Sequence, residues 1–387
     1  MPWLETDVLE QRIRFVTAAL QPGVNRRALC RAFQISPPTA YKWLARYAAD
    51  GAVRGLRDVS RRPHTLPQRT APATEAAVVA VRRQYGWAGR KLQPLLAAAG
   101  HHVAPATIDR IIRRHGLTDR DEAHRPAVQR FEHATPNALW QMDFKGQYPL
   151  PRGWAFPLSI LDDHSRFAVG LAALTSTAGA PVRRVLQRCF QAYGVPDAIL
   201  LDHGVPWWHA TSAQGLTRVT VFLLEQDITV RYSGLAHPQT QGKVERFHRT
   251  LGRRLRQWGV PTSSSAFAQA LARFRREYNE VRPHEALGQQ PPATRYRPSR
   301  RPYRPRPRAW DYPADHQVVR VTAAGTLRFR GHTWYLSEAL AGRWVACRVL
   351  EDHALVAFRG HYLRELNLRT TRVGPVPLQR LQVLTMS

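Results

Sequence analysis

Three acidic residues occupy separate motifs in a chain that is otherwise strongly basic. Asp143 lies in WQMDFKG, Asp202 in ILLDHG, and Glu245 in HPQTQGKVERFHR. Carboxylates that are far apart in sequence but meet in the fold are typical ligands of hard divalent cations, which activate phosphate esters for displacement. The three acids therefore predict a site for two Mg²⁺ or Mn²⁺ ions and a reaction at phosphodiester bonds.

The sequence around these acids indicates the elements that must bring them together. Asp143 falls in an apolar segment typical of a strand, and Asp202 follows the short apolar strand 198–201. Glu245 would begin a helix over 240–258. Its apolar residues recur every three or four positions, as expected for a face that packs on a sheet: Val244, Phe247, Leu251, Leu255 and Trp258. A second stripe would remain free to follow a phosphate backbone: Arg246, Arg249, Arg253 and Arg256.

The charge balance favours a polyanionic partner. The chain has 57 Lys plus Arg against 28 Asp plus Glu, a formal net charge of +29, and each phosphate that it neutralises releases condensed counterions. A membrane surface is disfavoured, because the sequence has neither a long apolar run nor an amphipathic anchor. The three cysteines are too far apart for a zinc module, and the first residues lack a secretory signal pattern. We therefore expect a bacterial cytoplasmic protein that acts at the nucleoid.

Residues 1–53 have the pattern of a helix-turn-helix DNA-binding domain. Apolar residues recur at helical spacing between 9 and 20, and Asn25 is placed to cap a second helix. Ser36 and Pro37 would begin a third helix. That helix would present three residues to the major groove of DNA: Thr39, Lys42 and Arg46.

A second copy of this plan is predicted at 73–120, after a basic linker at 54–72. Its helices would span 74–85, 90–99 and 105–115. The last helix would turn its isoleucines inward and four charged residues outward, with Arg110 and Arg113 as DNA contacts: Asp109, Arg110, Arg113 and Arg114. A single unit of this kind is also compatible with a small helical bundle, whereas two in tandem on a basic chain favour DNA binding.

Residues 134–292 predict an α/β core with a mixed sheet. Short apolar strands come first, and helices and strands then alternate. The strands are expected at 139–148, 155–162, 167–174, 198–201 and 229–232, and the helices at 180–193, 216–226, 240–258 and 265–279. Asp162 and Asp163 are rival acids, but their neighbours favour a structural role in which an aspartate caps a turn or pairs with Arg166. Trp207 and Trp208 could stack on a flipped base or pack under the loop that carries them.

The C-terminal part begins with a segment that we expect to be an extended linker, residues 293–317. Residues 293–310 contain seven arginines and four prolines without an acid, a composition typical of an extended chain. Six short strand-like segments with glycines at the turns then predict a small β-barrel over 318–370.

These motifs together resemble insertion-sequence transposases of the retroviral-integrase superfamily. The resemblance rests on W-x-x-D-F, D-H-S-R at 163–166, D-x-G at 202–204, HPQTQGKVERFHRTL at 237–251 and Y-N-x-x-R-P-H-E-A-L at 278–287. It implies a ribonuclease-H-like α/β catalytic core behind tandem homeodomain-like helix-turn-helix modules. It also assigns Asp143, Asp202 and Glu245 to a D-D-E triad that holds the metal ions.

The triad departs from the family pattern in two ways. Asp202 follows Asp143 by 59 residues and Glu245 follows Asp202 by 43; the second separation is longer than is common, which we attribute to extra loop around 208–215. The family usually has Asn after the second aspartate, whereas this chain has His203. A histidine there can still donate a hydrogen bond to DNA or to the loop.

The resemblance implies a DDE transposase. Such an enzyme would bind the element ends, hydrolyse phosphodiester bonds to free 3′-hydroxyls, and join them to target DNA by two-metal-ion transesterification. Its partners would be double-stranded DNA, both terminal inverted repeats and target, and further copies of the chain in a dimer or tetramer. The predicted DNA contacts in the core include two of the only four lysines: Lys145, His203, Gln239, Gln241, Lys243, Arg246, Arg249 and Arg253.

Two other functions are compatible with parts of the sequence. A non-catalytic DNA-binding regulator is disfavoured by the intact triad, unless His203 has disabled it. A metal-dependent nuclease without strand transfer is disfavoured by the two helical modules, because a degradative enzyme does not need to recognise terminal sequences.

Overall fold

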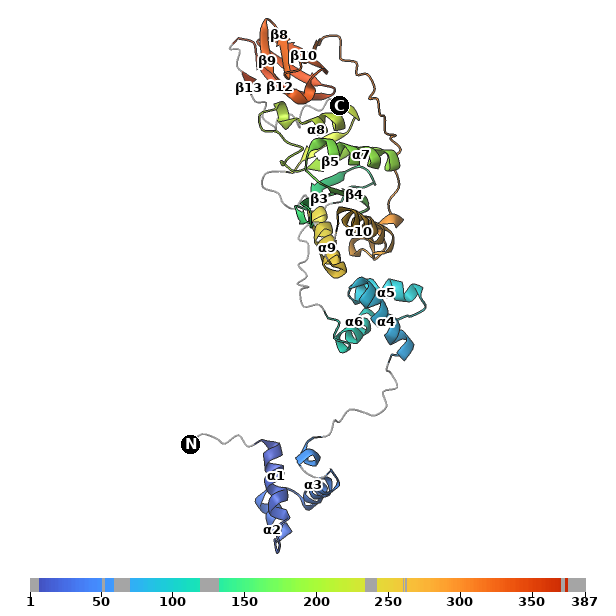
Figure 1. Ribbon diagram of the computed structural model, residues 1–387, viewed down its shortest axis with the longest axis vertical. Helices are drawn as coiled ribbons and strands as arrows, with labels where there is room; N and C mark the ends of the chain where they lie inside the picture. The colour runs from blue at the N-terminus through green and yellow to red at the C-terminus, as the bar shows by residue number, and fades with distance from the viewer. Residues whose placement is uncertain are drawn as a thin grey trace. The chain divides into compact units, whose positions relative to one another are not determined.

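The computed structural model of the chain describes residues 7–50, 53–58, 70–118, 132–233, 242–259, 261, 263–369 and 373–374 (Figure 1). The chain divides into two units, residues 1–71 and 72–387. The first unit is helical, and the second contains a second helical module, a mixed sheet with helices of its own, and a C-terminal sheet.

The first unit has the predicted helix-turn-helix pattern, with α1 at Val8–Ala19, α2 at Arg26–Ala32 and α3 at Pro37–Asp50. The Asn25 side chain accepts hydrogen bonds from two amides of α2, so its predicted capping role is confirmed. A short 3-10 helix, η1 at Val53–Leu56, completes the apolar core, because Leu56 is 1% exposed. The helical module therefore extends past residue 53, where the sequence predicted a linker to begin.

The second helical module consists of α4 at Pro72–Tyr85, α5 at Gly89–Ala98 and α6 at Pro105–Arg114, close to the predicted ranges. The isoleucines of α6 are buried, as expected. The prediction that Asp109 points outward is wrong. Its carboxylate accepts a hydrogen bond from the amide of Gly89 at 2.8 Å and so satisfies a free donor at the start of α5.

The core sheet has strands β1 at Trp140–Phe144, β2 at Tyr148–Pro149, β3 at Trp154–Asp162, β4 at Ala168–Leu174, β5 at Ala198–Leu201 and β6 at Thr229–Tyr232. Its order is β2-β3-β1-β5-β6, with β4 beside β3. β3 runs antiparallel to β1, whereas β5 and β6 run parallel to it. This is the mixed α/β core that the sequence predicts.

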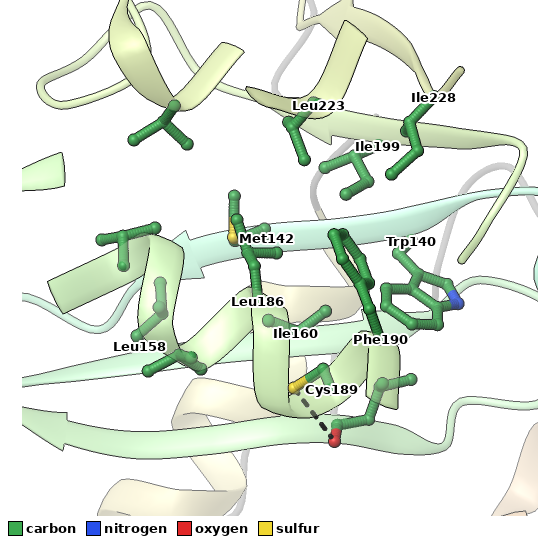
Figure 2. Close-up of a cluster of buried hydrophobic side chains, with 14 of the residues drawn as sticks. Trp140, Met142, Leu158, Ile160, Leu186, Cys189, Phe190, Ile199, Leu223 and Ile228 are labelled. Atoms are coloured by element: carbon green, nitrogen blue, oxygen red, sulfur yellow. Dashed lines mark hydrogen bonds between the residues drawn. The ribbon is translucent and has the colours of Figure 1, made fainter. Parts of the chain in front are cut away.

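Helices cover both faces of this sheet (Figure 1). One face packs on α7 at Gly179–Tyr193 and α8 at Arg218–Glu225, and Figure 2 shows the sheet residues Trp140 and Met142 against Leu186 and Phe190 of α7. The other face packs on α9 at Gly242–Trp258 and α10 at Ser264–Arg276, which continues as a π-helical turn at Glu277–Val281. Because successive side chains of a strand point to opposite faces, Asp143 faces the α9 side.

The arginine-rich segment is more firmly held than the predicted linker. The 3-10 turn η5 at Glu285–Leu287 comes before this segment, and the 3-10 turn η6 at Pro292–Thr294 lies at its start. Residues 295–316 then contain no helix or strand. However, Tyr296 is buried and stacks on Phe167 at 4.2 Å between ring centroids. Arg301 donates hydrogen bonds to the carbonyls of Pro196 and Asp227. Aromatic and guanidinium groups therefore fasten this segment along the core.

The C-terminal strands form an open sheet rather than the predicted barrel. The strands are β7 at Gln317–Arg320, β8 at Thr326–Phe329, β9 at His332–Tyr335, β10 at Trp344–Leu350, β11 at His353–Phe358, β12 at His361–Asn367 and β13 at Val373–Gly374. Five strands pair in the order β13-β12-β11-β10-β7, and β8 and β9 pair only with each other, so the barrel prediction is wrong. The sheet, the hairpin and α8 bury one common apolar cluster, which includes Leu216 and Leu224. Among the described helices, none is both long and apolar enough to cross a membrane.

Candidate active site

Asp143 lies near the end of β1, opposite Ser159 of β3 in the strand register. Its side chain is 21% exposed. Burial, together with the nearby charges of Asp202 and Glu245, raises the pKa of Asp143 to about 7. These contributions tie the three predicted acids to one region of the molecule.

Asp202 follows β5, the parallel neighbour of β1. Trp140 pairs with Ile199 and Gln141 with Leu200, and the same register carried to the strand ends brings Asp202 level with Asp143. Neighbouring strands lie about 4.8 Å apart. The two aspartates therefore project from adjacent strand ends.

Trp207 holds the carboxylate of Asp202. Its indole Nε1 donates a hydrogen bond to Oδ1 of Asp202 at 2.5 Å, and the amide of Gly204 donates to the same oxygen at 3.0 Å. The indole is 1% exposed and stacks on Phe144 of β1 at 5.3 Å. Of the two roles considered for Trp207, packing under the loop is therefore the one that the structure supports.

Glu245 lies in the first turn of α9 and is exposed. The apolar stripe of the same helix is buried as predicted, with Val244 and Phe247 among its residues, and it packs against β3 and β4. In the described part of the chain, no three His, Cys, Asp or Glu side chains stand close enough together to hold one metal ion. Asp202 and Glu245 therefore act electrostatically on Asp143, but the three acids do not form a ready-made coordination shell.

His248 is a site residue that the sequence interpretation missed. Its Nε2 lies 2.9 Å from the hydroxyl of Ser159, and its Nδ1 lies 3.8 Å from Oδ2 of Asp143. Burial, together with the charge of Lys145, lowers the pKa of His248 to about 4, so the ring is neutral at pH 7. The sequence could have identified His248 by its position: it comes three residues after Glu245, so the two side chains are neighbours on the helix surface.

The two lysines near the acids have different surroundings. Burial and the charge of Arg256 lower the pKa of Lys145. The end of the Lys145 side chain lies beside Gly252 of α9, where an added Cβ would be 3.4 Å from its Nζ. Lys243, which the sequence predicted to contact DNA, forms a salt bridge with the buried carboxylate of Asp163.

The rival acids Asp162 and Asp163 are structural, as the sequence indicated. Oδ1 of Asp162 accepts hydrogen bonds from the amide and the hydroxyl of Ser165, which caps the turn after β3. Arg166 pairs with Glu132 at 2.9 Å rather than with either aspartate. The partner that the sequence did not reveal is Lys243 for Asp163.

His203, the departure from the family pattern, lies in an aromatic cluster. Its ring stacks on Tyr232 at 5.2 Å and meets Trp208 edge to face at 4.8 Å. Its imidazole is half-buried. The cluster packs beside Asp202, so His203 supports the loop that follows this acid.

The other predicted DNA contacts are mostly on the surface. In α9, Arg246, Arg249 and Arg253 are exposed, and in α6 so are Arg110 and Arg113. In α3, Lys42 is exposed, Thr39 shares a hydrogen bond with Ser36 at 2.8 Å, and Arg46 donates to the carbonyl of Arg57 at 2.8 Å. Gln239 and Gln241 lie outside the described residues.

Arg254 differs from its neighbours in the arginine-rich helix α9. It is buried and pairs with Glu277 at 2.6 Å, and it donates to the carbonyl of Gln84 in α4 at 2.8 Å. It therefore joins α9 to the second helical module rather than to solvent.

Comparison with known proteins agrees with this arrangement. Residues 133–238 and 226–292 each match a family described as integrase core domain. Residues 11–64 match a helix-turn-helix domain, and residues 39–112 match a homeodomain-like domain.

Two similar proteins come from bacterial insertion elements. The chain is 28% identical over 213 residues to the insertion element IS407 uncharacterized 31.7 kDa protein of Burkholderia multivorans, covering 53% of this chain and 73% of that protein. It is 27% identical over 243 residues to the insertion element IS476 uncharacterized 39.2 kDa protein of Xanthomonas euvesicatoria, covering 57% of this chain and 65% of that protein. The chain thus spans just under two thirds of the second relative. Among solved structures, the HTLV-2 integrase catalytic core domain in complex with magnesium matches with a TM-score of 0.34 and 14% identity, covering 42% of this chain and 97% of that one.

Proposed function

We infer that this chain, a member of the integrase-core superfamily that includes insertion-sequence transposases, is a DDE transposase that cuts phosphodiester bonds at element ends and joins the freed 3′-hydroxyls to target DNA. The observation that carries this proposal is that acids from three different elements lie in one region: the register of β1 and β5 brings Asp202 level with Asp143, and burial, with the charges of Asp202 and Glu245, raises the pKa of Asp143 to about 7. A carboxylate whose pKa is raised by burial and by neighbouring acids is typical of a functional site, and a bound cation would offset the repulsion among the three charges.

The donor set fits divalent metal ions. Carboxylate oxygens are the preferred ligands of Mg²⁺ and Mn²⁺. Among the described residues, His248 is the basic group within ion-pair distance of Asp143, and it is neutral at pH 7. We propose that Asp143, Asp202 and Glu245 hold two such ions, which would activate the attacking oxygen and stabilise the leaving oxygen of an in-line displacement.

The residues of the chain prepare this site in distinct ways. Trp207 and the amide of Gly204 orient one oxygen of Asp202. Asp143 must release its remaining proton before it can bind a cation, so cation binding would strengthen as pH rises through 7. The three acids would have to come closer together to share an ion, because among the described residues no three such side chains are spaced to hold one.

The basic surface provides for the DNA. We propose that the exposed arginines of α9 contact phosphates beside the acids, which fixes the strand without reading its sequence. The α3 and α6 helices, with Lys42, Arg110 and Arg113 exposed, would read the terminal inverted repeats in the major groove. Because two ends must be joined at one target, we expect a dimer or tetramer on DNA, and this reaction would take place at the bacterial nucleoid.

The test is a strand-transfer assay with the full-length protein, Mg²⁺ or Mn²⁺, a labelled duplex that carries the element end, and a plasmid target. We expect a joined product with the wild-type protein and none with the Glu245→Gln variant, which preserves the size of the side chain but removes its charge. Cleavage without joining would favour a nuclease. Binding of the end without either reaction would favour a regulatory protein.

A further inference from the structure

A buried carboxylate outside the triad connects the elements that carry two of the three acids. Asp163 follows β3, is 0% exposed, and donates its backbone amide to the carbonyl of Leu139 at 2.9 Å. A buried charge is strongly unfavourable without partners, so the contacts of the Asp163 carboxylate show which groups it keeps in place.

Each oxygen of Asp163 has two donors. Oδ1 accepts from Nε2 of Gln141 at 2.8 Å and from the ammonium of Lys243. Oδ2 accepts from the amide of His133 at 2.9 Å and lies 3.1 Å from its Nδ1. Lys243 also reaches the carbonyl oxygen of Asp163 at 3.4 Å. Burial raises the pKa of Asp163, but the hydrogen bonds from Lys243 and His133 outweigh it, so the carboxylate stays ionised.

The two partners on the core elements stand next to the proposed metal ligands. Gln141 precedes Asp143 by two residues in β1 and therefore lies on the same face of the strand. Lys243 precedes Glu245 by two residues in the first turn of α9. One carboxylate is therefore bonded to both the strand of Asp143 and the helix of Glu245.

Apolar packing alone does not set the position of Glu245. Val244 and Phe247 hold α9 on the sheet, but hydrophobic contact is non-directional and permits small shifts along the helix axis. A shift by one residue moves the helix about 1.5 Å, which is enough to separate Lys243 from Asp163 and leave a buried charge unpaired. The ion pair therefore helps to fix the register of the first turn of α9, while the contact of His248 with Ser159 of β3 fixes the next turn.

We propose that Asp163 is a positioning residue, which clamps Lys243 and Gln141 and thereby sets where Glu245 stands relative to Asp143. This inference rests on the proposed function of the triad. It assigns to Lys243 a role inside the protein rather than at the DNA backbone.

The experiment compares Asp163→Asn, Lys243→Met and the double variant, each in the full-length protein. Binding of Mn²⁺ is measured by calorimetry. We expect affinity to fall roughly tenfold in each single variant and by about the same factor in the double variant, because the two residues act as one unit. Losses that multiply to about a hundredfold would overturn the proposal, as would affinities equal to the wild type.

The matched control is Glu277→Gln, which breaks the buried pair with Arg254 on the same helix but away from its first turn. Its Mn²⁺ affinity should stay within about twofold of the wild type. An equal loss in this control would mean that general loosening of α9 explains the result, and would also overturn the proposal.

The salt dependence of DNA binding distinguishes two roles for Lys243, as the partner of Asp163 or as a contact to a DNA phosphate. Lys243→Met should leave unchanged the slope of log affinity against log salt concentration, whereas loss of a phosphate contact would reduce that slope by about one. If Asp163→Asn does not fold, Lys243→Arg replaces it: moving the donors should weaken Mn²⁺ binding with the same salt slope, and wild-type Mn²⁺ affinity would refute the clamp. A wild-type protein that binds no Mn²⁺ would refute the proposed function itself.

Discussion

Replacing Asp143 by asparagine should stabilise the metal-free protein at alkaline pH. The folded protein holds the proton of Asp143 up to a pKa of about 7, compared with an ordinary value of 3.8. The folded state therefore binds more protons than the unfolded state between these values, and wild-type stability falls as pH rises from about 4 to about 7. Asparagine has no charge to lose, so Asp143→Asn should escape this fall.

The size of the effect follows from the same pKa. At about 1.36 kcal/mol for each pKa unit, the difference corresponds to roughly 4 kcal/mol. This value is an upper bound, because the side chain of Asp143 is 21% exposed and solvent screens its interactions. We expect Asp143→Asn to be about 2 kcal/mol more stable than the wild type at pH 8, and nearly equal to it at pH 4.

The assay is chemical unfolding of the full-length protein with a chelator present, at several pH values from 4 to 8. Adding Mg²⁺ or Mn²⁺ at pH 8 should reverse the order, because the cation stabilises the wild type but not the variant. The control is Asp197→Asn, which removes an exposed surface ion pair with Arg301 and should change stability by less than about 1 kcal/mol without this pH pattern. The reasoning fails if Asp143→Asn gains nothing at pH 8, or if its gain is the same at pH 4.

Four further variants test other parts of the protein. Trp207→Phe removes the donor to Asp202 but keeps an aromatic ring, so the single-turnover joining rate should fall about tenfold, for the loss of roughly 1–1.5 kcal/mol; an unchanged rate would contradict the orienting role. Arg249→Gln should lower the salt slope of DNA binding by about one with an unchanged thermal midpoint. Arg254→Gln should instead cost about 3 kcal/mol of stability, because it leaves a buried carboxylate unpaired; thermal unfolding of both variants distinguishes the roles. Lys42→Ala should weaken the footprint on the element end and leave Mn²⁺ affinity unchanged, and an intact footprint would remove α3 from end recognition.

The local elements of the core were predictable because their signals are short-range. Apolar periodicity identified the strands β1, β3 and β4 and the helix α9 with its buried face. Capping chemistry identified Asn25 for the same reason, since a side chain that bonds an amide two or three residues away is visible in the sequence.

The errors arose where a side chain pairs across a long stretch of chain. Asp109 binds an amide twenty residues away. The partners of Lys243, which binds Asp163 eighty residues away, and of Arg254, which pairs with Glu277, have no signal in the nearby sequence either. Charge alone placed Asp109 on the surface, since charged residues are rarely buried unless paired. The prediction of a C-terminal β-barrel was wrong for a similar reason: the sequence pattern predicts the strands, but not whether the first and last strands pair to close a barrel.

The fastening of the arginine-rich segment affects when during synthesis a working core can exist. Tyr296 and Tyr303 lie in or against the apolar cluster behind β1, and the C-terminal sheet covers α8. A nascent chain that ends near residue 292 would therefore contain all three acids but leave apolar surface open on both sides of α8. Proteolysis of ribosome-bound chains of increasing length should show protection of the core only after these later residues emerge. Completion of the chain would then be a condition for an active centre, so an interrupted copy of the protein would have little capacity to cut DNA.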